Sequence, residues 1–232
     1  MPGKPQKSLS HTQRRGDERR QRLLAAAATL LERQDAGDVT FAAVCAAADV
    51  PPGSARFFYR DIHELLRALL LELAKEHDTA LMAPLRPRDV EDWRSLVGCL
   101  IDRSARFQRS HAVFAKLSIG GQTLPELKRM DRAADRQRSQ GVLALLDEYF
   151  VVPRIPDLER IAYFITETVD LAFSLSMNEA GRITPAWLEL AKNAATELLA
   201  HHFGGELKRR PSGPGNMSGN QRCPIPETNK SM

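Results

Sequence analysis

The sequence predicts an all-α protein of about nine helices, and three observations support this fold class. Apolar residues recur at the spacing of one helix face over most of the 232 residues. No segment alternates between apolar and polar residues as a half-buried strand would. Thr, Asp or Pro stands where several apolar stripes begin, and Gly or Pro stands where they end, as expected at helix ends.

The N-terminal segment 1–16 is polar and basic, and we expect it to be a disordered arm. A first helix is predicted from Asp17 to Arg33. Its buried stripe consists of Leu23, Leu24, Ala27, Leu30 and Leu31. Residues 35–38, with the sequence Asp-Ala-Gly-Asp, end this helix.

Residues 39–66 predict two short helices around a tight turn, followed by the start of a third. Thr40 precedes the first of them and can cap it. Its apolar face consists of Phe41, Val44, Cys45 and Ala48. Asp49 tolerates the left-handed backbone conformation that a sharp turn needs. Pro52 suits the first position of the second helix, so the segment has the layout of a helix-turn-helix.

The residues after this turn suit a helix that enters a DNA major groove. Gly53 permits close approach of the backbone, and Ser54 can reach a base edge or a phosphate. Arg56 can pair with guanine or with a phosphate. Of Phe57 and Phe58, we expect one to face DNA and the other to pack inward. The predicted DNA-binding residues are Arg14, Arg15, Arg19, Thr40, Pro52, Gly53, Ser54, Arg56, Phe57 and Arg60.

The same segment resembles the DNA-binding end of the TetR family of bacterial transcriptional regulators. The matching positions are Ala48, Val50, Gly53, Ser54, Asp61 and Leu65. Tyr59 stands in place of the Phe of the family pattern. Arg56 stands where the family has a phosphate-contacting Tyr, and Ile62 stands where it has a phosphate-contacting Lys. Asp49 and Pro51 replace the turn Gly and the capping Ser.

The resemblance implies a dimeric, sequence-specific DNA-binding regulator. It implies a repressor that a small apolar or amphipathic ligand releases from a palindromic operator. The expected domains are a helix-turn-helix domain at 17–66 and a helical effector-binding and dimerisation domain at 67–203. The alternatives are an all-α ligand-binding protein or enzyme, or a family member that has lost DNA binding.

The second domain is predicted to consist of helices throughout. They span about 61–82, 89–109, 112–119, 124–149, 157–177 and 185–202. The first half of the 124–149 helix is highly charged, and we interpret it as a solvent-facing surface. Residues 204–232 are rich in Pro, Gly, Ser and Asn and predict a disordered tail.

The last two helices, at 158–178 and 185–203, are apolar on more than one face. Such helices bury against more than one partner, and we expect them to form the homodimer interface. The predicted ligand-binding residues are large or polar side chains of the second domain. They are Trp93, Phe107, Phe114, Tyr163, Thr166, Asp170 and Phe173. The spacing of Tyr163, Thr166 and Asp170 places them on one helix face.

Composition limits the other function classes. Cys45, Cys99 and Cys223 are far apart and odd in number, so neither a disulfide framework nor a zinc site is predicted. No nucleophile and base stand at catalytic spacing, so we expect no enzyme activity, no cofactor and no metal. No apolar stretch reaches bilayer length, which predicts a protein outside the membrane. The absence of an N-terminal apolar signal segment predicts a cytoplasmic location.

Overall fold

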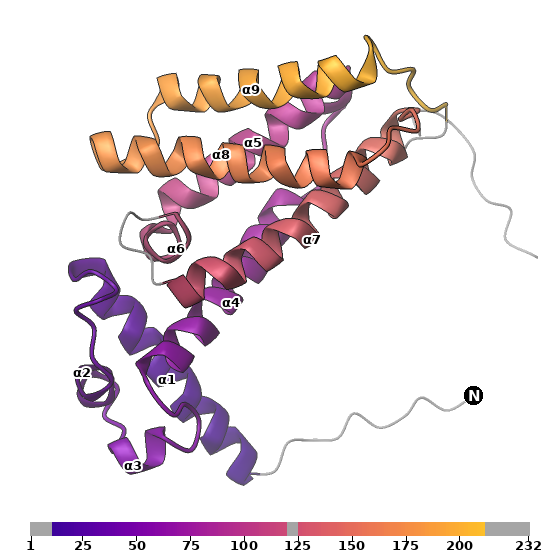
Figure 1. Cartoon of the computed structure of the whole chain (residues 1–232). Helices are drawn as coiled ribbons and strands as arrows, with labels where there is room; N and C mark the ends of the chain where they lie inside the picture. The colour runs from indigo at the N-terminus through magenta and orange to yellow at the C-terminus, as the bar shows by residue number, and fades with distance from the viewer. Residues whose placement is uncertain (1–10, 120–124, 212–232) are drawn as a thin grey trace, which may run out of the picture.

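The computed structural model describes residues 11–119 and 125–211, and Figure 1 shows how their helices are arranged. Within these residues the chain forms nine α-helices and a short 3₁₀ helix, η1, which confirms the all-α prediction. The α-helices are α1 (His11–Arg33), α2 (Phe41–Ala47), α3 (Pro52–Ala55), α4 (Ile62–Leu81), α5 (Trp93–Ser110), α6 (Ala112–Ser118), α7 (Pro125–Tyr149), α8 (Leu158–Ala180) and α9 (Pro185–Phe203). Among the described residues, none of the helices has both the length and the apolar content of a bilayer-spanning segment.

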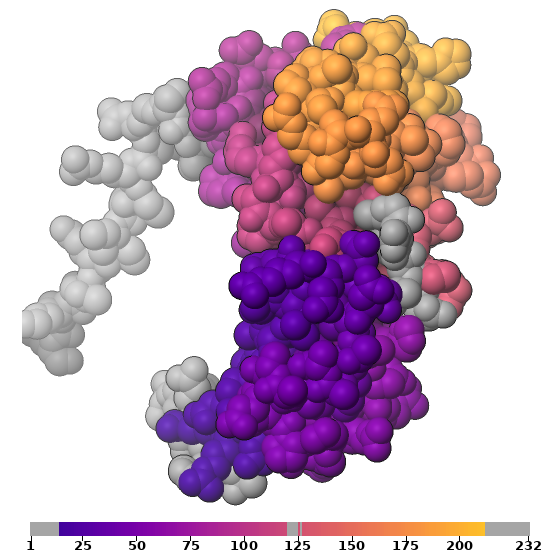
Figure 2. Space-filling view, turned by 90° about the vertical axis from the view of Figure 1, so that its left-hand side faces the viewer, coloured from indigo at the N-terminus to yellow at the C-terminus, as the bar shows by residue number. Residues whose placement is uncertain are grey.

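Helices α1 to α3 and the first half of α4 pack into an N-terminal lobe, which Figure 2 shows as the indigo and purple part of the surface. Leu23 of α1, Val44 of α2 and Leu65 of α4 are fully buried in its core. Asp61 begins α4 by accepting a 2.9 Å hydrogen bond from the backbone N–H of Glu64. The Glu64 side chain accepts a 2.8 Å bond from the backbone N–H of Arg60, so both side chains cap the start of α4.

The second lobe contains α5 to α9, and α8 and α9 lie side by side along its outer edge (Figure 1). Asp92 caps α5 by accepting a 2.7 Å hydrogen bond from the backbone N–H of Ser95. Gly181 ends α8 with a φ of 65°, a left-handed conformation that glycine adopts without strain. Thr184 caps α9, and Pro185 occupies its first turn. These short connections hold α8 and α9 as an antiparallel pair.

Helix α4 belongs to both lobes. Its residues from Leu65 to Ala74 pack in the N-terminal core, whereas Leu81 packs in the core of the second lobe. At its C-terminal end, Arg103 of α5 donates 2.9 Å hydrogen bonds to the carbonyl oxygens of Leu81 and Pro84. The segment after α4 is therefore fixed against α5.

Two predicted boundaries were wrong. Residues 11–16, assigned to a disordered arm, form the start of α1. Gly16 lies in that helix, and a Cβ there would be 3.8 Å from the ring of Phe58, so the added turns pack on the turn after α3. The predicted disordered tail begins too early, because residues 204–211 return to α7. Arg210 donates a 2.8 Å backbone bond to the carbonyl of Tyr149 and pairs with Asp147 at 2.6 Å. The rest of the predicted arm and tail lies outside the described residues.

Candidate DNA-binding face and effector cavity

The turn between α2 and α3 has the geometry that its residues predict. Thr40 caps α2 by accepting a 3.2 Å hydrogen bond from the backbone N–H of Ala43. Asp49 adopts a φ of 50°, the left-handed conformation expected of this turn. Val50 is buried beneath the turn, and Pro52 starts α3. Residues 40–55 therefore form a helix-turn-helix.

The residues after the turn present an uneven surface. Arg56 and Gly53 are exposed, Ser54 is half-buried, and Phe57 is 86 % exposed. Phe58 is half-buried and packs against the core of the N-terminal lobe. The α-helical part is short and ends at Ala55, although backbone hydrogen bonds continue the helical turn to Tyr59. Of the two adjacent phenylalanines, Phe57 is therefore the one that faces outward.

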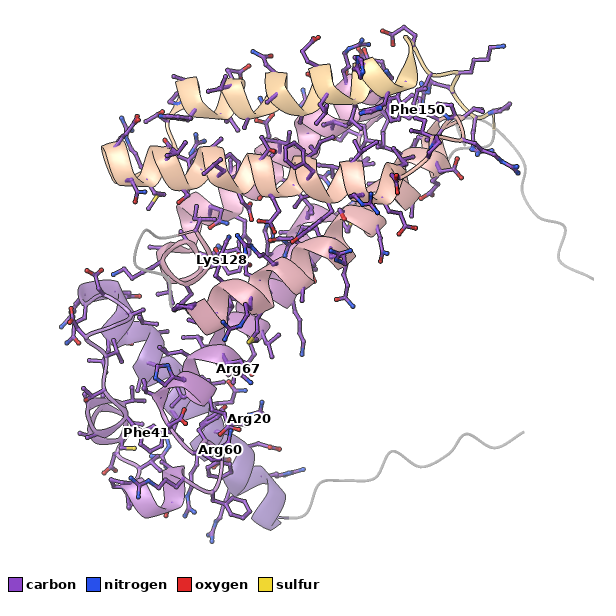
Figure 3. The ribbon with its side chains drawn as sticks, viewed as in Figure 1. Arg20, Phe41, Arg60, Arg67, Lys128 and Phe150 are labelled. Atoms are coloured by element: carbon purple, nitrogen blue, oxygen red, sulfur yellow. The ribbon has the colours of Figure 1, made fainter. Side chains whose placement is uncertain are left out.

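Arginines of α1 and of the turn after α3 lie on the same lobe (Figure 3). The predicted contacts Arg14, Arg15 and Arg19 are all exposed on α1. Arg20, which was not predicted, donates a 3.1 Å hydrogen bond to the hydroxyl of Tyr59. This bond ties α1 to the end of the helix-turn-helix and so positions the arginines of α1 beside it.

Arg60 is exposed, but its guanidinium also pairs with Glu64 at 3.3 Å. Because this pair is on the surface, it contributes little to stability and does not prevent a phosphate contact. The backbone hydrogen bond from Arg60 and the Arg60 side chain both lower the pKa of Glu64. The predicted DNA-binding residues thus gather on one lobe, with Thr40 and Pro52 also exposed.

The second lobe contains a partly open cavity of about 90 Å³ between α4, α5, α7 and α8, with Leu199 of α9 also in its wall. Aliphatic side chains form most of its wall. They include Leu81, Val97, Leu100, Val142, Ile165 and Val169. Of the predicted ligand-binding residues, Thr166 and Asp170 line this cavity. A cavity with an apolar wall and few polar groups suits a small, mainly apolar molecule.

The other predicted ligand-binding residues do not line the cavity. Trp93 is fully buried, packs edge-on against the ring of Phe203, and donates a 3.3 Å hydrogen bond to the carbonyl of Gly205. The guanidinium of Arg136 stacks over the ring of Tyr163, with its Cζ 4.6 Å from the centroid of that ring. Phe173 is fully buried in the core of the second lobe.

Phe107 and Phe114 belong to the core of the N-terminal lobe. Their rings meet edge to face at 5.3 Å between centroids. Each also contacts the ring of His77 on α4, with centroids 5.1 and 5.2 Å away. The prediction treated large aromatic side chains as ligand contacts, whereas here their size fills the junction between the lobes. Both rings contact His77, and His77 in turn lines the cavity.

Several polar residues of the cavity region were missed by the sequence interpretation. Lys128, Asp131, Asp135 and Arg138 lie on α7, whose charged first half was interpreted as solvent-facing, and Lys128 marks its start in Figure 3. Asp131 and Asp135 are 3 % and 0 % exposed. The four residues recur at intervals of three, four and three, which places them on one helix face. That spacing was the available signal.

Ion pairs connect this buried face. Lys128 pairs with Asp131 at 3.3 Å, and Arg138 pairs with Asp135 and, at 2.8 Å, with Asp78 of α4. Carboxylate oxygens of Asp131, Asp135 and Asp170 lie within 4.8 Å of one another. Such oxygens are hard donors suited to a cation, but Lys128 and Arg138 already neutralise two of these groups.

Burial shifts the protonation of these groups. Burial, helped by the nearby Arg138, lowers the pKa of His77 to about 3, so its imidazole is neutral. Burial also raises the pKa of Asp135 and of Asp170, and the neighbouring carboxylates raise both further. At the polar end of the cavity, burial therefore disfavours the charged form of these side chains.

The outer face of α8 and α9 exposes large apolar side chains. Phe164, Leu171 and Leu175 of α8 are 61 %, 58 % and 38 % exposed, and Leu190 of α9 is 53 % exposed. The three α8 residues are spaced seven and four apart, so they share one helix face. An apolar stripe of this kind on an outer face is typical of a protein–protein interface.

Comparisons with known proteins agree with this geometry. Residues 91–203 match the model of the family described as "Tetracyclin repressor-like, C-terminal domain". Among curated proteins, none matches the sequence.

Several solved structures are similar to the chain in fold. A TetR-family transcriptional regulator from Streptomyces coelicolor has a TM-score of 0.59 at 21 % identity, covering 79 % of this chain and 99 % of that one. A putative TetR-family regulator from Shewanella sp. PV-4 has a TM-score of 0.52 at 17 % identity, covering 82 % and 99 %. RolR, in complex with its ligand resorcinol, has a TM-score of 0.53 at 16 % identity, covering 80 % and 89 %.

Proposed function

This chain is a TetR-family transcriptional regulator, and on that premise we propose that it is a homodimeric repressor released from a palindromic operator by a small apolar or amphipathic ligand. The observation that carries the proposal is the outward placement of Arg56 and Phe57 at the end of the helix-turn-helix. The ring of Phe57 meets the ring of Phe58 edge to face with centroids 5.4 Å apart, but it is still 86 % exposed, so most of it is available for a contact with a partner.

Each half of the dimer would insert one helix-turn-helix into a major groove. Arg56 would contact a base edge or a phosphate, and Phe57 would contact a thymine methyl group. Arg14, Arg15 and Arg19, which are exposed on α1, would neutralise phosphates beside the groove. Two heads about one DNA turn apart then bind two half-sites together, which gives the affinity that one short helix lacks.

The exposed apolar stripe of Phe164, Leu171 and Leu175 supports dimerisation through α8, together with Leu190 of α9. In a two-fold dimer, α8 and α9 of each subunit would form a four-helix interface. The same arrangement would place the two N-terminal lobes on one side of the dimer, where they can reach one face of the DNA.

The cavity is the proposed effector site. Helix α4 supports a link to DNA binding, because one end of it lines the cavity and the other end begins beside the helix-turn-helix. A ligand that displaces α4 would change the spacing of the two heads, and ligand and DNA would then weaken each other's binding equally. That RolR is described with resorcinol supports a small ligand, without identifying the ligand of this chain.

A gel-shift assay with DNA from upstream of the gene, at two salt concentrations, tests the proposal. We expect a specific shift that weakens at higher salt. Arg56→Ala should reduce both the affinity and its dependence on salt. Arg106→Ala, at an exposed site on α5, is the matched control and should change neither. A shift that Arg56→Ala leaves unaltered would contradict the proposal, and no specific shift at all would favour a family member without DNA binding.

A further inference from the structure

Three side chains are buried yet have a polar atom without a protein hydrogen-bond partner; two of them line the polar end of the cavity, and the third, Asp135, lies beside it. They are His77, whose Nδ1 is unpartnered, Asp135, whose Oδ2 is unpartnered, and Arg138, whose Nη2 is unpartnered. His77 is 3 % exposed, Asp135 is 0 % exposed, and the Arg138 side chain is 8 % exposed. Leaving such groups unmatched costs free energy, so they indicate a partner that the protein itself does not supply.

Asp170 of α8 extends this set. Its carboxylate lines the cavity and makes no hydrogen bond or ion pair with any other residue in the described ranges 11–119 and 125–211. By contrast, the cavity hydroxyls of Ser139 and Thr166 donate to the carbonyl oxygens of Arg136 and Ala162 in their own helices. The polar groups of the lining that remain for a ligand are therefore the carboxylate of Asp170, which is an acceptor, the Nη2 of Arg138, which is a donor, and the Nδ1 of His77.

We propose that the cavity binds a neutral molecule of one ring bearing a hydroxyl group, of the phenol class, whose O–H donates to Asp170 and whose oxygen accepts from Arg138. This inference rests on the proposed function, in which the cavity is the effector site. A hydroxyl group donates and accepts at the same atom, so it can bond the carboxylate of Asp170 and the Nη2 of Arg138 at once. The aliphatic wall, which includes Leu100 and Val169, packs against the ring.

Charged ligands fit this end of the cavity less well. A carboxylate would face Asp135 and Asp170, whose neighbours already include Asp131. An ammonium group could pair with Asp170, but it would face Arg138 and leave the Nη2 of that arginine unsatisfied. A divalent cation would use the three carboxylates but none of the apolar wall. The mixture of one donor and one acceptor is what favours the neutral hydroxyl.

The size of the cavity limits the rest of the ligand. Its volume of about 90 Å³ is below the ~150 Å³ of an engineered cavity that holds benzene. A single ring therefore fits with a small outward movement of the wall, and a second ring does not. The movement would be shared by the helices that line the cavity, α4 and α8 among them.

The test is calorimetric titration of the full-length protein with phenol and with toluene, which replaces the hydroxyl by a methyl group of similar size. We expect phenol to bind at least about tenfold more tightly, because a hydrogen bond to a charged group is lost with toluene. In Asp170→Leu, the affinity for phenol should fall to within about threefold of the affinity for toluene. Toluene should still bind this variant, which shows that the cavity is intact.

Two further variants and three further probes complete the test. Asp170→Asn keeps an acceptor oxygen and should retain part of the preference for phenol. Glu148→Leu, at an exposed site of α7, is the matched control and should retain all of it. Equal affinity for phenol and toluene in the wild type would overturn the inference. Tighter binding of benzylammonium or of Mn²⁺, lost in Asp170→Leu, would replace it by a cation or a metal site respectively. Tighter binding of benzoate, kept or strengthened in Asp170→Leu, would replace it by an anion site.

Failure of this inference can be told apart from failure of the proposed function. Operator binding is measured separately by gel shift, without any ligand. If operator binding is specific but phenol does not bind, the proposed ligand class is wrong, whereas the proposal of a DNA-binding regulator stands. If phenol binds through Asp170 but the chain shows no specific operator, the cavity inference stands and the repressor proposal fails.

Discussion

The ammonium group of Lys116, on α6, donates a 2.7 Å hydrogen bond to the carbonyl oxygen of Leu31 at the C-terminal end of α1. The same ammonium group donates a 2.8 Å bond to the carbonyl oxygen of Gln34. Both acceptors belong to the carbonyls that a helix end leaves without an internal partner. A single side chain of the second lobe therefore caps the first helix of the N-terminal lobe, in addition to the junction that α4 makes.

Replacing Lys116 by methionine keeps the apolar stem but removes the donors. We expect Lys116→Met to lower the free energy of unfolding by about 1–2 kcal/mol, because the carbonyl oxygens of Leu31 and Gln34 lose a charged donor. Urea denaturation followed by circular dichroism measures this change. Lys75→Met, at an exposed site of α4, is the control and should have almost no effect. Equal stability of the two variants would mean that the cap contributes nothing.

Phe57 and Phe58 are predicted to separate DNA binding from stability. Phe57→Ala should change the free energy of unfolding by no more than about 0.5 kcal/mol, because the side chain is 86 % exposed. It should nevertheless weaken operator binding, since the ring would contact DNA. Phe58→Ala should cost about 2–3 kcal/mol, because that ring is half-buried against the core.

Chemical denaturation and gel shift, run on both phenylalanine variants, check this prediction. The Phe57 variant should retain the wild-type unfolding midpoint while its operator affinity falls. Wild-type operator affinity in Phe57→Ala would show that the exposed ring does not contact DNA. A stability loss as large as that of Phe58→Ala would show that Phe57 is buried in solution.

The helix-turn-helix could be predicted from sequence because its signals are local. Thr40 caps a helix whose apolar face follows immediately, and Asp49 takes the left-handed conformation that the turn demands. Both effects involve residues within a few positions of each other. The cap that Asp61 and Glu64 form at the start of α4 is equally local.

The cavity could be predicted only in part because its lining comes from distant segments. Asp170 was predicted as a ligand contact, but the charged residues around it belong to α7. In the sequence, the stripe of four residues from Lys128 to Arg138 resembles a solvent-facing surface, and only the packing of α4 and α8 buries it. Phe107 and Phe114, which were predicted to contact the ligand, do not line the cavity, since periodicity does not distinguish an aromatic that fills a junction from one that lines a cavity. Tertiary packing decides both cases.

The exposed stripe of α8 yields a prediction about assembly. Leu171→Glu should dissociate the proposed dimer, because a charge in the centre of an apolar interface is left without a partner. The monomer fold should be unaffected, since Leu171 is 58 % exposed. Analytical ultracentrifugation measures the mass of the particle in solution, which should fall to that of a monomer. Operator affinity should fall as well, because only a dimer binds two half-sites. Leu71→Glu, at a site 47 % exposed on α4, is the control and should remain dimeric. A dimer that survives Leu171→Glu would place the interface elsewhere.

His77 is predicted to make the protein less stable as the pH falls. Burial lowers its pKa from an ordinary value of about 6.5 to about 3, so the folded state excludes a proton that the unfolded state binds. The contribution of His77 is therefore constant above pH 6.5 and becomes destabilising below it. Between pH 7 and pH 5 the difference amounts to about 2 kcal/mol.

The groups that face His77 define what else titrates near it. Arg138 and His111 both oppose its protonation, Asp78 lies 3.9 Å from its Nδ1, and the hydroxyl of Ser104 lies 3.0 Å from its Nε2. Asp170, across the cavity, has a raised pKa and so changes stability in the opposite direction, losing it as the pH rises. A measurement on the wild type alone would sum these effects.

Comparing the wild type with His77→Phe isolates the histidine. The phenylalanine ring keeps the packing on Phe107 and Phe114 but cannot be protonated. Urea denaturation at pH 7, 6 and 5 should show the wild type losing about 2 kcal/mol more than His77→Phe over this range. His63→Gln, at an exposed site of α4, should follow the wild type. Parallel stability curves for the wild type and His77→Phe would mean that the imidazole takes up its proton in the folded state, and that the polar end of the cavity is more hydrated than its burial implies.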